Sequence, residues 1–212
     1  MAQGIRTAIE GIPKQPEPTL TSSLILSGEE VAKVKTEPKV TVEEDLSSEK
    51  GVNYIRLRDL LKVNKWRDAD YETYLMMLQA VGRQKGDWIR SEELANFPLT
   101  DLRTVNQLWM KYSNGHFGFS VQKRIYESIG GHLDGEYDYQ TLEKFGDRVQ
   151  WRINSSWITY NSLIFSLNAP EGYLPVLPCG FGIREWEKGR SFWIGWGLSD
   201  LRLSSLLQHQ DL

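Results

Sequence analysis

Residues 108–122 read LWMKYSNGHFGFSVQ and contain the end of one helix, a turn and the start of another helix. The Ser113-Asn114-Gly115 triplet is typical of a helix C-terminus, because Asn and Gly tolerate the backbone that a tight turn requires. Ser120 is a residue type that caps helices, so we expect the next helix to begin there. Between these signals, the open backbone of Phe117-Gly118-Phe119 favours exposure of both rings to a flat apolar ligand. The alternative is that both rings fill the space between helices.

Helical periodicity extends on both sides of this stretch. Apolar residues recur at intervals of three or four from Tyr54 to Ile129, which is typical of helices with one buried face. Turn and capping residues divide this region and the residues after it into separate helices. The predicted elements are a helical hairpin turning near Asn64 and breaking at Gly82, a short helix opened by Ser91, a helix restarting at Pro98, a helix capped by Ser120 and ended by Gly130-Gly131, a short helix preceded by Asp138 and stopped at Gly146, and an amphipathic end with Leu201, Leu206 and Leu207. Beyond residue 149 the pattern fits short helices or extended loops. The sequence therefore predicts an all-α fold, a compact multi-helix domain with long loops.

The composition changes sharply near residue 50. Residues 1–50 contain no aromatic residue, half of the prolines and an excess of Glu. Such a segment buries too little apolar surface to offset the entropy lost on ordering, so we expect a flexible tail. All eight tryptophans follow it. The predicted organisation is a tail over residues 1–50 and a helical domain over residues 51–212.

The charge balance and the cysteine content exclude several classes of function. The formal net charge is -3, so the chain lacks the basic excess of a nucleic-acid-binding protein. Cys179 is the single cysteine, which rules out an intramolecular disulfide and fits a reducing compartment. No run of residues approaches the roughly 20 apolar positions that cross a bilayer. We therefore expect a soluble protein.

A search for catalytic and metal-binding patterns yields little. None of the three histidines has the spacing of a metal-binding pair. His132 and Asp134 could form an acid-base pair, but neighbouring loop residues of these types are common. Gly115 and Gly118 lack the strand before them and the Lys-Ser/Thr ending of a phosphate-binding loop. We predict a protein that is not an enzyme and requires no cofactor or metal.

A second segment, residues 166–175, reads SLNAPEGYLP, and its prolines and glycine favour a rigid loop. Together with residues 108–122 it resembles the genomes-uncoupled-four family, the tetrapyrrole-binding accessory proteins of magnesium chelatase. The resemblance extends from about residue 53 to about residue 185. The matching residues are Trp66-Arg67-Asp68-Ala69-Asp70, Thr73, Trp88, Phe97-Pro98, Asp101-Leu102, Leu108-Trp109, Tyr112-Ser113-Asn114-Gly115, Phe117-Gly118-Phe119-Ser120-Val121-Gln122, Ala169-Pro170-Glu171-Gly172 and Leu174-Pro175.

The resemblance implies an all-α core whose helices and long loops form a cupped apolar surface for a porphyrin. The implied ligands are protoporphyrin IX and its magnesium complex, and the implied protein partner is the large porphyrin-binding subunit of magnesium chelatase. Stimulation of this enzyme in chlorophyll synthesis is the implied function. We expect a monomer in a cyanobacterial cytoplasm or a plastid stroma, with peripheral association with the thylakoid membrane left open.

The site implied by the resemblance combines aromatic, apolar and basic side chains, which suit the flat face and the propionate groups of a porphyrin. Its predicted members are Phe117, Phe119, Val121, Phe165, Tyr173 and, for a propionate, Arg184. Trp109, Trp151 and Tyr112 are expected to lie in the core or behind the site. Lys123 and Arg124 fit either a solvated helix face or a ligand role.

Three departures from the family pattern affect this prediction. Tyr173 stands where the family loop has His, Phe165 stands where Trp is expected, and the polar tail replaces the helical bundle that cyanobacterial members often carry. The alternatives are a bilin or heme sensor with the same cup, a protein-interaction module, and a sugar binder with an aromatic platform. Visible absorption after addition of a tetrapyrrole separates the porphyrin binder from the bilin or heme sensor, and an unchanged spectrum leaves the interaction module or the sugar binder.

Overall fold

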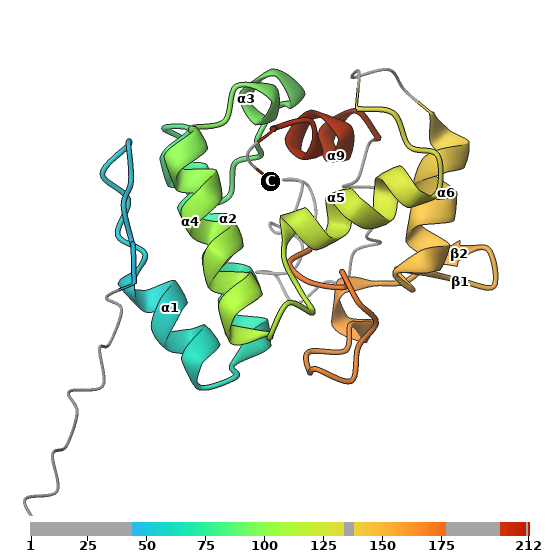
Figure 1. Ribbon diagram of the computed structural model, residues 1–212, viewed down its shortest axis with the longest axis horizontal. Coiled ribbons are helices and arrows are strands. Elements are labelled where there is room, and N and C mark those ends of the chain that lie inside the picture. Colours follow the sequence, from blue (N-terminus) through green and yellow to red (C-terminus); the bar gives the residue numbers. More distant parts are fainter. Residues whose placement is uncertain (1–43, 134–137, 177–199, 211) are drawn as a thin grey trace, which may run out of the picture. The chain divides into compact units, whose positions relative to one another are not determined.

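The computed structural model describes residues 44–133, 138–176, 200–210 and 212. Helices make up most of the secondary structure, as Figure 1 shows, and this confirms the predicted all-α fold. In chain order the helices are α1 (Ile55–Lys62), α2 (Trp66–Ala80), α3 (Ser91–Ala95), α4 (Leu99–Tyr112), α5 (Phe119–Ser128), α6 (Tyr139–Arg148), the 3-10 helix η1 (Tyr160–Ser162) and α9 (Asp200–Leu207). Two short strands, β1 (Arg152–Ile153) and β2 (Ser156–Trp157), lie between α6 and η1.

The N-terminal helices pack around one apolar core. Helix α1 contacts both α2 and α4, and the predicted hairpin turn is present at Asn64, which has a positive φ of 58°. The C-terminal helix α9 lies against α3 and α5 (Figure 1). Its side chains Leu203, Leu206 and Leu207 are buried, as the amphipathic pattern predicts for the last two. The segment α1 to α5 and the C-terminal helix therefore share a core.

Helix α5 begins differently from the prediction. Its first residue is Phe119 and its N-cap is Gly118, so Ser120 lies inside the first turn. The Ser120 backbone N–H and hydroxyl both donate to Asn106 Oδ1, at 3.0 and 3.1 Å. The cap is thus supplied by a side chain of α4, which a search for local capping residues does not find.

Helix α6 confirms one predicted boundary and corrects another. Asp138 Oδ1 accepts hydrogen bonds from the backbone N–H groups of Gln140 and Thr141, as expected of an N-cap. The predicted stop at Gly146 is wrong, because the helix continues to Arg148. A Cβ at Gly146 would lie 2.6 Å from the Trp157 ring. Glycine here permits close packing of this ring and does not end the helix.

The β1–β2 hairpin was missing from the prediction of helices or loops beyond residue 149. Its strands are antiparallel, with Arg152 opposite Trp157. The two connecting residues, Asn154 and Ser155, have φ values of 49° and 61°. Positive φ at both positions is characteristic of the tight turn that joins two paired strands. Each strand has only two residues, too few to show an alternating pattern.

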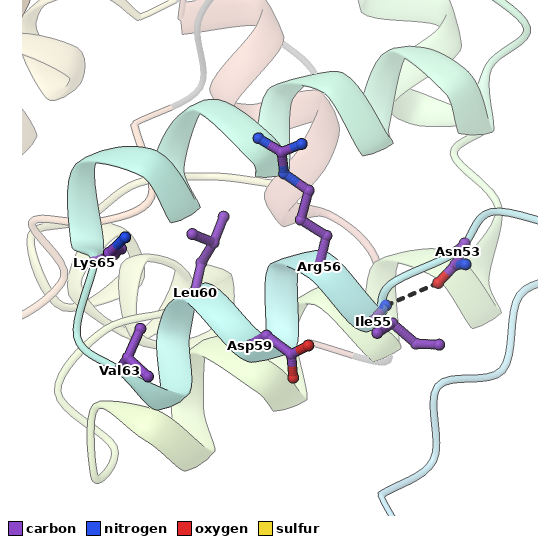
Figure 2. Close-up of a pocket in the computed structure, with 7 residues that line it drawn as sticks. All are labelled: Asn53, Ile55, Arg56, Asp59, Leu60, Val63 and Lys65. Atoms are coloured by element: carbon purple, nitrogen blue, oxygen red, sulfur yellow. Dashed lines mark hydrogen bonds between the residues drawn. The ribbon is translucent and has the colours of Figure 1, made fainter.

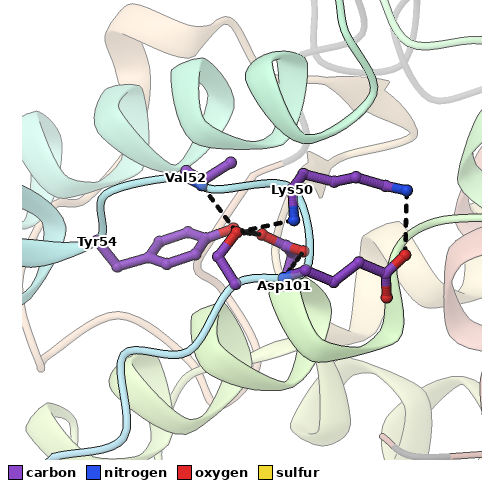
Figure 3. Close-up of polar contacts among 6 residues, drawn as sticks. Lys50, Val52, Tyr54 and Asp101 are labelled. Atoms are coloured by element: carbon purple, nitrogen blue, oxygen red, sulfur yellow. Dashed lines mark hydrogen bonds and ion pairs between the residues drawn. The ribbon is translucent and has the colours of Figure 1, made fainter.

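The predicted tail boundary at residue 50 is placed too late. The buried carboxylate of Asp101 accepts hydrogen bonds from the Ser48 hydroxyl, the Glu49 N–H and the Tyr54 hydroxyl, the last two at 3.0 and 2.9 Å (Figure 3). Burial and the Asp101 charge raise the pKa of Tyr54 above its ordinary value. Further along the segment, Glu44 accepts a hydrogen bond from the Tyr112 hydroxyl. Residues 44–50 therefore pack on α4, and the rest of the predicted tail lies outside the described residues.

Candidate functional site

The two segments that stand out in the sequence lie against each other. The Gly118 N–H donates to the Leu174 carbonyl at 3.0 Å, and the Gly172 N–H donates to the His116 carbonyl at the same distance. The His116 ring adds a third contact, since its Nε2 lies 2.7 Å from the Ala169 carbonyl and must carry the proton there. In Figure 1 the orange loop passes the start of α5. The loop is thereby tied to the Phe117-Gly118-Phe119 corner.

Helix α5 and Trp151, three residues after the end of α6, also hold the loop. The buried Gln122 side chain donates from Nε2 to the carbonyls of Gly172 and Pro175, at 3.0 and 2.8 Å. Trp151 Nε1 donates to the Tyr173 carbonyl at 2.8 Å. Gly172 has a φ of 73°, and a Cβ there would lie 2.6 Å from Ile125 Cδ1. These contacts satisfy buried backbone carbonyls and fix the loop in one conformation.

Helix α2 contacts both the corner and the segment that contains the loop. Trp66 packs edge-on against Phe117, with ring centroids 5.6 Å apart. One turn later, Asp70 is buried and accepts a hydrogen bond from the Tyr160 hydroxyl and another from the Val176 N–H, both at 2.7 Å. Asp70 therefore ties α2 to both ends of the segment 160–176.

Burial dominates the electrostatics of Asp70. Removal from water raises the pKa of its carboxyl to about 7. The hydrogen bonds from Tyr160 and Val176 and the charge of Arg67 act in the opposite direction and reduce this rise. Both carboxylate oxygens are engaged, so the group serves as an internal tie between α2 and the loop.

Four of the predicted site residues are buried. The exposed fractions of Phe117, Phe119 and Val121 are 0%, and that of Tyr173 is 1%. The expectation that both phenylalanine rings are exposed is wrong, because Trp66 and Trp109 enclose Phe117 and both rings belong to the core. Trp109 and Trp151 are also fully buried, as expected, and Tyr112 is partly buried. The direct contact of the four residues with a ligand stays a prediction.

Phe165 is the predicted site residue that reaches the surface in the described part of the chain. It is half-buried, and its neighbours Ile164 and Leu167 are 45% and 46% exposed. We call these three side chains the loop face. The Phe165 ring packs against Tyr160, with centroids 5.5 Å apart, and lies under the guanidinium of Arg67. An exposed apolar group on a rigid loop is typical of a binding surface.

The sequence also offered three basic residues for the site: Arg184, Lys123 and Arg124. Arg184 lies outside the described residues. Lys123 Nζ donates to the His209 carbonyl at 2.7 Å, and Arg124 forms an ion pair with Glu171 at 2.5 Å. These two cations therefore hold α9 and the loop in place. Sequence reasoning assigned no role to Arg67 and Asp70, although both belong to the quoted Trp66–Asp70 motif.

A separate hollow of about 590 Å³ lies along α1 (Figure 2). None of the predicted site residues lines it. Its lining residues are Asn53, Ile55, Arg56, Asp59, Leu60, Val63 and Lys65. Among the described residues, no cluster of His, Cys, Asp or Glu is suited to hold a metal ion. No helix in the described ranges is long and apolar enough to cross a membrane.

A family model with the description GUN4-like matches residues 47–188, which include α1 to α6, the hairpin and the loop. The chain belongs to the GUN4-like family. The resemblance found in the sequence is thereby confirmed.

Relatives of this GUN4-like protein include one from a cyanobacterium and one from a plant. The Ycf53-like protein of Synechocystis sp. (strain ATCC 27184 / PCC 6803 / Kazusa) is 32% identical over 145 residues, which cover 67% of this chain and 58% of the relative. The chloroplastic tetrapyrrole-binding protein of Arabidopsis thaliana is 26% identical over 135 residues, covering 57% and 46% of the two chains. This GUN4-like chain thus spans about half the length of the curated relatives it matches.

The fold of this GUN4-like chain is also similar to a solved structure. It superimposes on GUN4 from Chlamydomonas reinhardtii with a TM-score of 0.59 and 26% sequence identity. The match covers 79% of this chain and 96% of the other.

Proposed function

We propose that this protein binds a tetrapyrrole on the loop face and regulates magnesium chelatase without catalysing a reaction itself. Family membership and the tetrapyrrole-binding name of the Arabidopsis relative support the ligand class. Protoporphyrin IX and Mg-protoporphyrin IX are the proposed ligands. The proposed protein partner is the large porphyrin-binding subunit of magnesium chelatase.

The observation that carries this proposal is the loop face itself. Ile164, Phe165 and Leu167 present apolar surface at one loop, while the backbone around them is fixed by the contacts of Tyr173 and Asp70. Tyr173 accepts a hydrogen bond from the Ile164 N–H at 3.2 Å. A flat π-system gains from contact with an aromatic ring and aliphatic side chains that need no reordering. The buried Phe117 and Phe119 would support this surface from behind.

The organisms and compartments of the relatives support a compartment in which photosynthetic pigments are made. The matched proteins include one from a cyanobacterium and one named as chloroplastic. We therefore propose a cyanobacterial cytoplasm or a plastid as the compartment, with contact to the thylakoid membrane as a further part of the proposal.

Absorption spectroscopy tests the ligand class directly. The purified chain is titrated with protoporphyrin IX, Mg-protoporphyrin IX, heme and a bilin, and the Soret or long-wavelength band is recorded. We expect a saturable shift with the two porphyrins. A shift with heme or bilin alone would identify the sensor alternative, and unchanged spectra with all four would contradict tetrapyrrole binding. Magnesium insertion by reconstituted chelatase, with and without the chain, tests the regulatory part.

A further inference from the structure

Arg67 places a positive charge over the Phe165 ring of the loop face. Its guanidinium carbon lies 4.6 Å from the centroid of the Phe165 ring, a distance typical of a cation–π contact. The side chain is exposed, and none of the described residues forms a hydrogen bond or an ion pair with it. The structure thus holds a cation beside an apolar surface and leaves its N–H donors to solvent.

The position of Arg67 over the Phe165 ring determines which ligand groups it can bind. A guanidinium whose contact is with an aromatic ring, and not with an acid group, keeps its N–H groups for paired hydrogen bonds with a carboxylate. Lysine would supply a charge but not this planar pair of donors. A flat ligand on the loop face that carries an acid group at its edge would meet both features at once.

The buried acid group of Asp70 on α2 does not occupy these donors. Asp70 lies one turn away and interacts with Arg67 through its charge, but its oxygens accept from the Tyr160 hydroxyl and the Val176 N–H. The aromatic contact, and not an ion pair, therefore fixes the guanidinium. This arrangement leaves Arg67 available for an acid group from outside.

We propose that Arg67 binds a free carboxylate of the tetrapyrrole, and that the site therefore selects tetrapyrroles with free acid side chains over esterified or amidated ones. The inference rests on the proposed tetrapyrrole-binding function. A porphyrin with two propionates has a second acid group, so a contact with Arg184 is compatible with this assignment.

The test compares a charged and a neutral porphyrin with the same ring. Deuteroporphyrin IX and its uncharged bis-amide are titrated into the wild-type chain and the variants Arg67→Met, Arg67→Lys and Arg148→Met, with tryptophan fluorescence as the signal. Arg148 is an exposed arginine near the C-terminal end of α6 and serves as the control for loss of one surface charge. Circular dichroism verifies that each variant is folded.

We expect Arg67→Met to weaken binding of the diacid about tenfold and binding of the amide less than twofold. Arg67→Lys should retain part of the affinity, and Arg148→Met should leave both unchanged. Equal weakening for diacid and amide would overturn the carboxylate contact and leave Arg67 as a support for Phe165. An unchanged affinity would overturn it as well. If the wild-type chain binds neither porphyrin, the proposed function fails along with this inference.

Discussion

Two regions of the molecule differ in how they use aromatic residues. The Phe117-Gly118-Phe119 corner belongs to the longest uninterrupted family motif, Phe117–Gln122, yet its phenylalanine rings are buried. The loop face at 164–167 has a weaker sequence signal, yet its apolar side chains reach solvent. Hydrogen bonds from Gly118 and Gln122 connect the corner to the loop. The comparison indicates that the motif marks the support of the surface, while the surface itself is supplied by the loop.

The largest expected effect is on stability and comes from the corner. Phe117→Ala removes a fully buried ring that packs against Trp66 and Trp109. We expect the free energy of unfolding to fall by about 3–5 kcal/mol, measured by urea denaturation. A fall of less than about 1 kcal/mol together with a weaker porphyrin affinity would show that the ring contacts the ligand, as its sequence suggested.

The tie that Asp70 makes between α2 and the segment 160–176 should depend on pH. Folding raises the pKa of Asp70 to about 7 from an ordinary value of 3.8, so the folded state binds its proton more tightly. The resulting stabilisation is complete below about pH 4 and is lost as pH rises through 7. Over this window we expect the wild-type free energy of unfolding to fall by up to roughly 4 kcal/mol relative to Asp70→Asn.

Asparagine is a suitable comparison because it can retain both contacts without a charge. Its oxygen can accept from the Val176 N–H, and its amide can donate to the Tyr160 hydroxyl. Urea denaturation of both proteins between pH 4 and pH 8 gives the difference directly. Parallel stability curves would contradict a raised pKa at Asp70.

A smaller effect is expected at the loop face, and it should appear in binding. Phe165→Ala removes the half-buried ring under Arg67. We expect porphyrin binding to weaken by about 1–3 kcal/mol, while the free energy of unfolding changes by about 1 kcal/mol. Absorption titration and urea denaturation of the same preparation separate the two quantities. The reverse pattern, a large stability loss with unchanged affinity, would assign Phe165 to the core.

The sequence predicted the elements with strong local signals. The hairpin turn at Asn64, the restart at Pro98 and the Asp138 cap follow from periodicity and capping preferences, and all three are present. The prediction failed where a distant partner decides the structure. Asn106 of α4 replaces the expected Ser120 cap, and the Trp157 ring accounts for Gly146 inside a helix.

The candidate site was predicted only in part, because distant partners also decide which of its side chains are buried. The sequence identified the corner and the loop as related segments, and the structure shows them in contact. It could not show which rings are buried, because a Phe beside Gly has the same local pattern in a core and on a surface. The role of Asp70 was also hidden from the sequence. Its contacts with Tyr160 and Val176, which are distant in the chain, show that this carboxyl group connects α2 to the loop segment.

The central claim is that the loop face, supported by the corner, contacts the tetrapyrrole. Two exposed isoleucines of similar accessibility test it: Ile164 on the loop face is 45% exposed, and Ile153 on β1 is 50% exposed. Protoporphyrin IX is titrated into Ile164→Ser and Ile153→Ser, and the dissociation constants are compared with that of the wild-type chain. We expect Ile164→Ser to weaken binding about fivefold, which corresponds to about 1 kcal/mol, and Ile153→Ser to have no effect. An unchanged dissociation constant for Ile164→Ser, or equal weakening by both substitutions, would contradict the account.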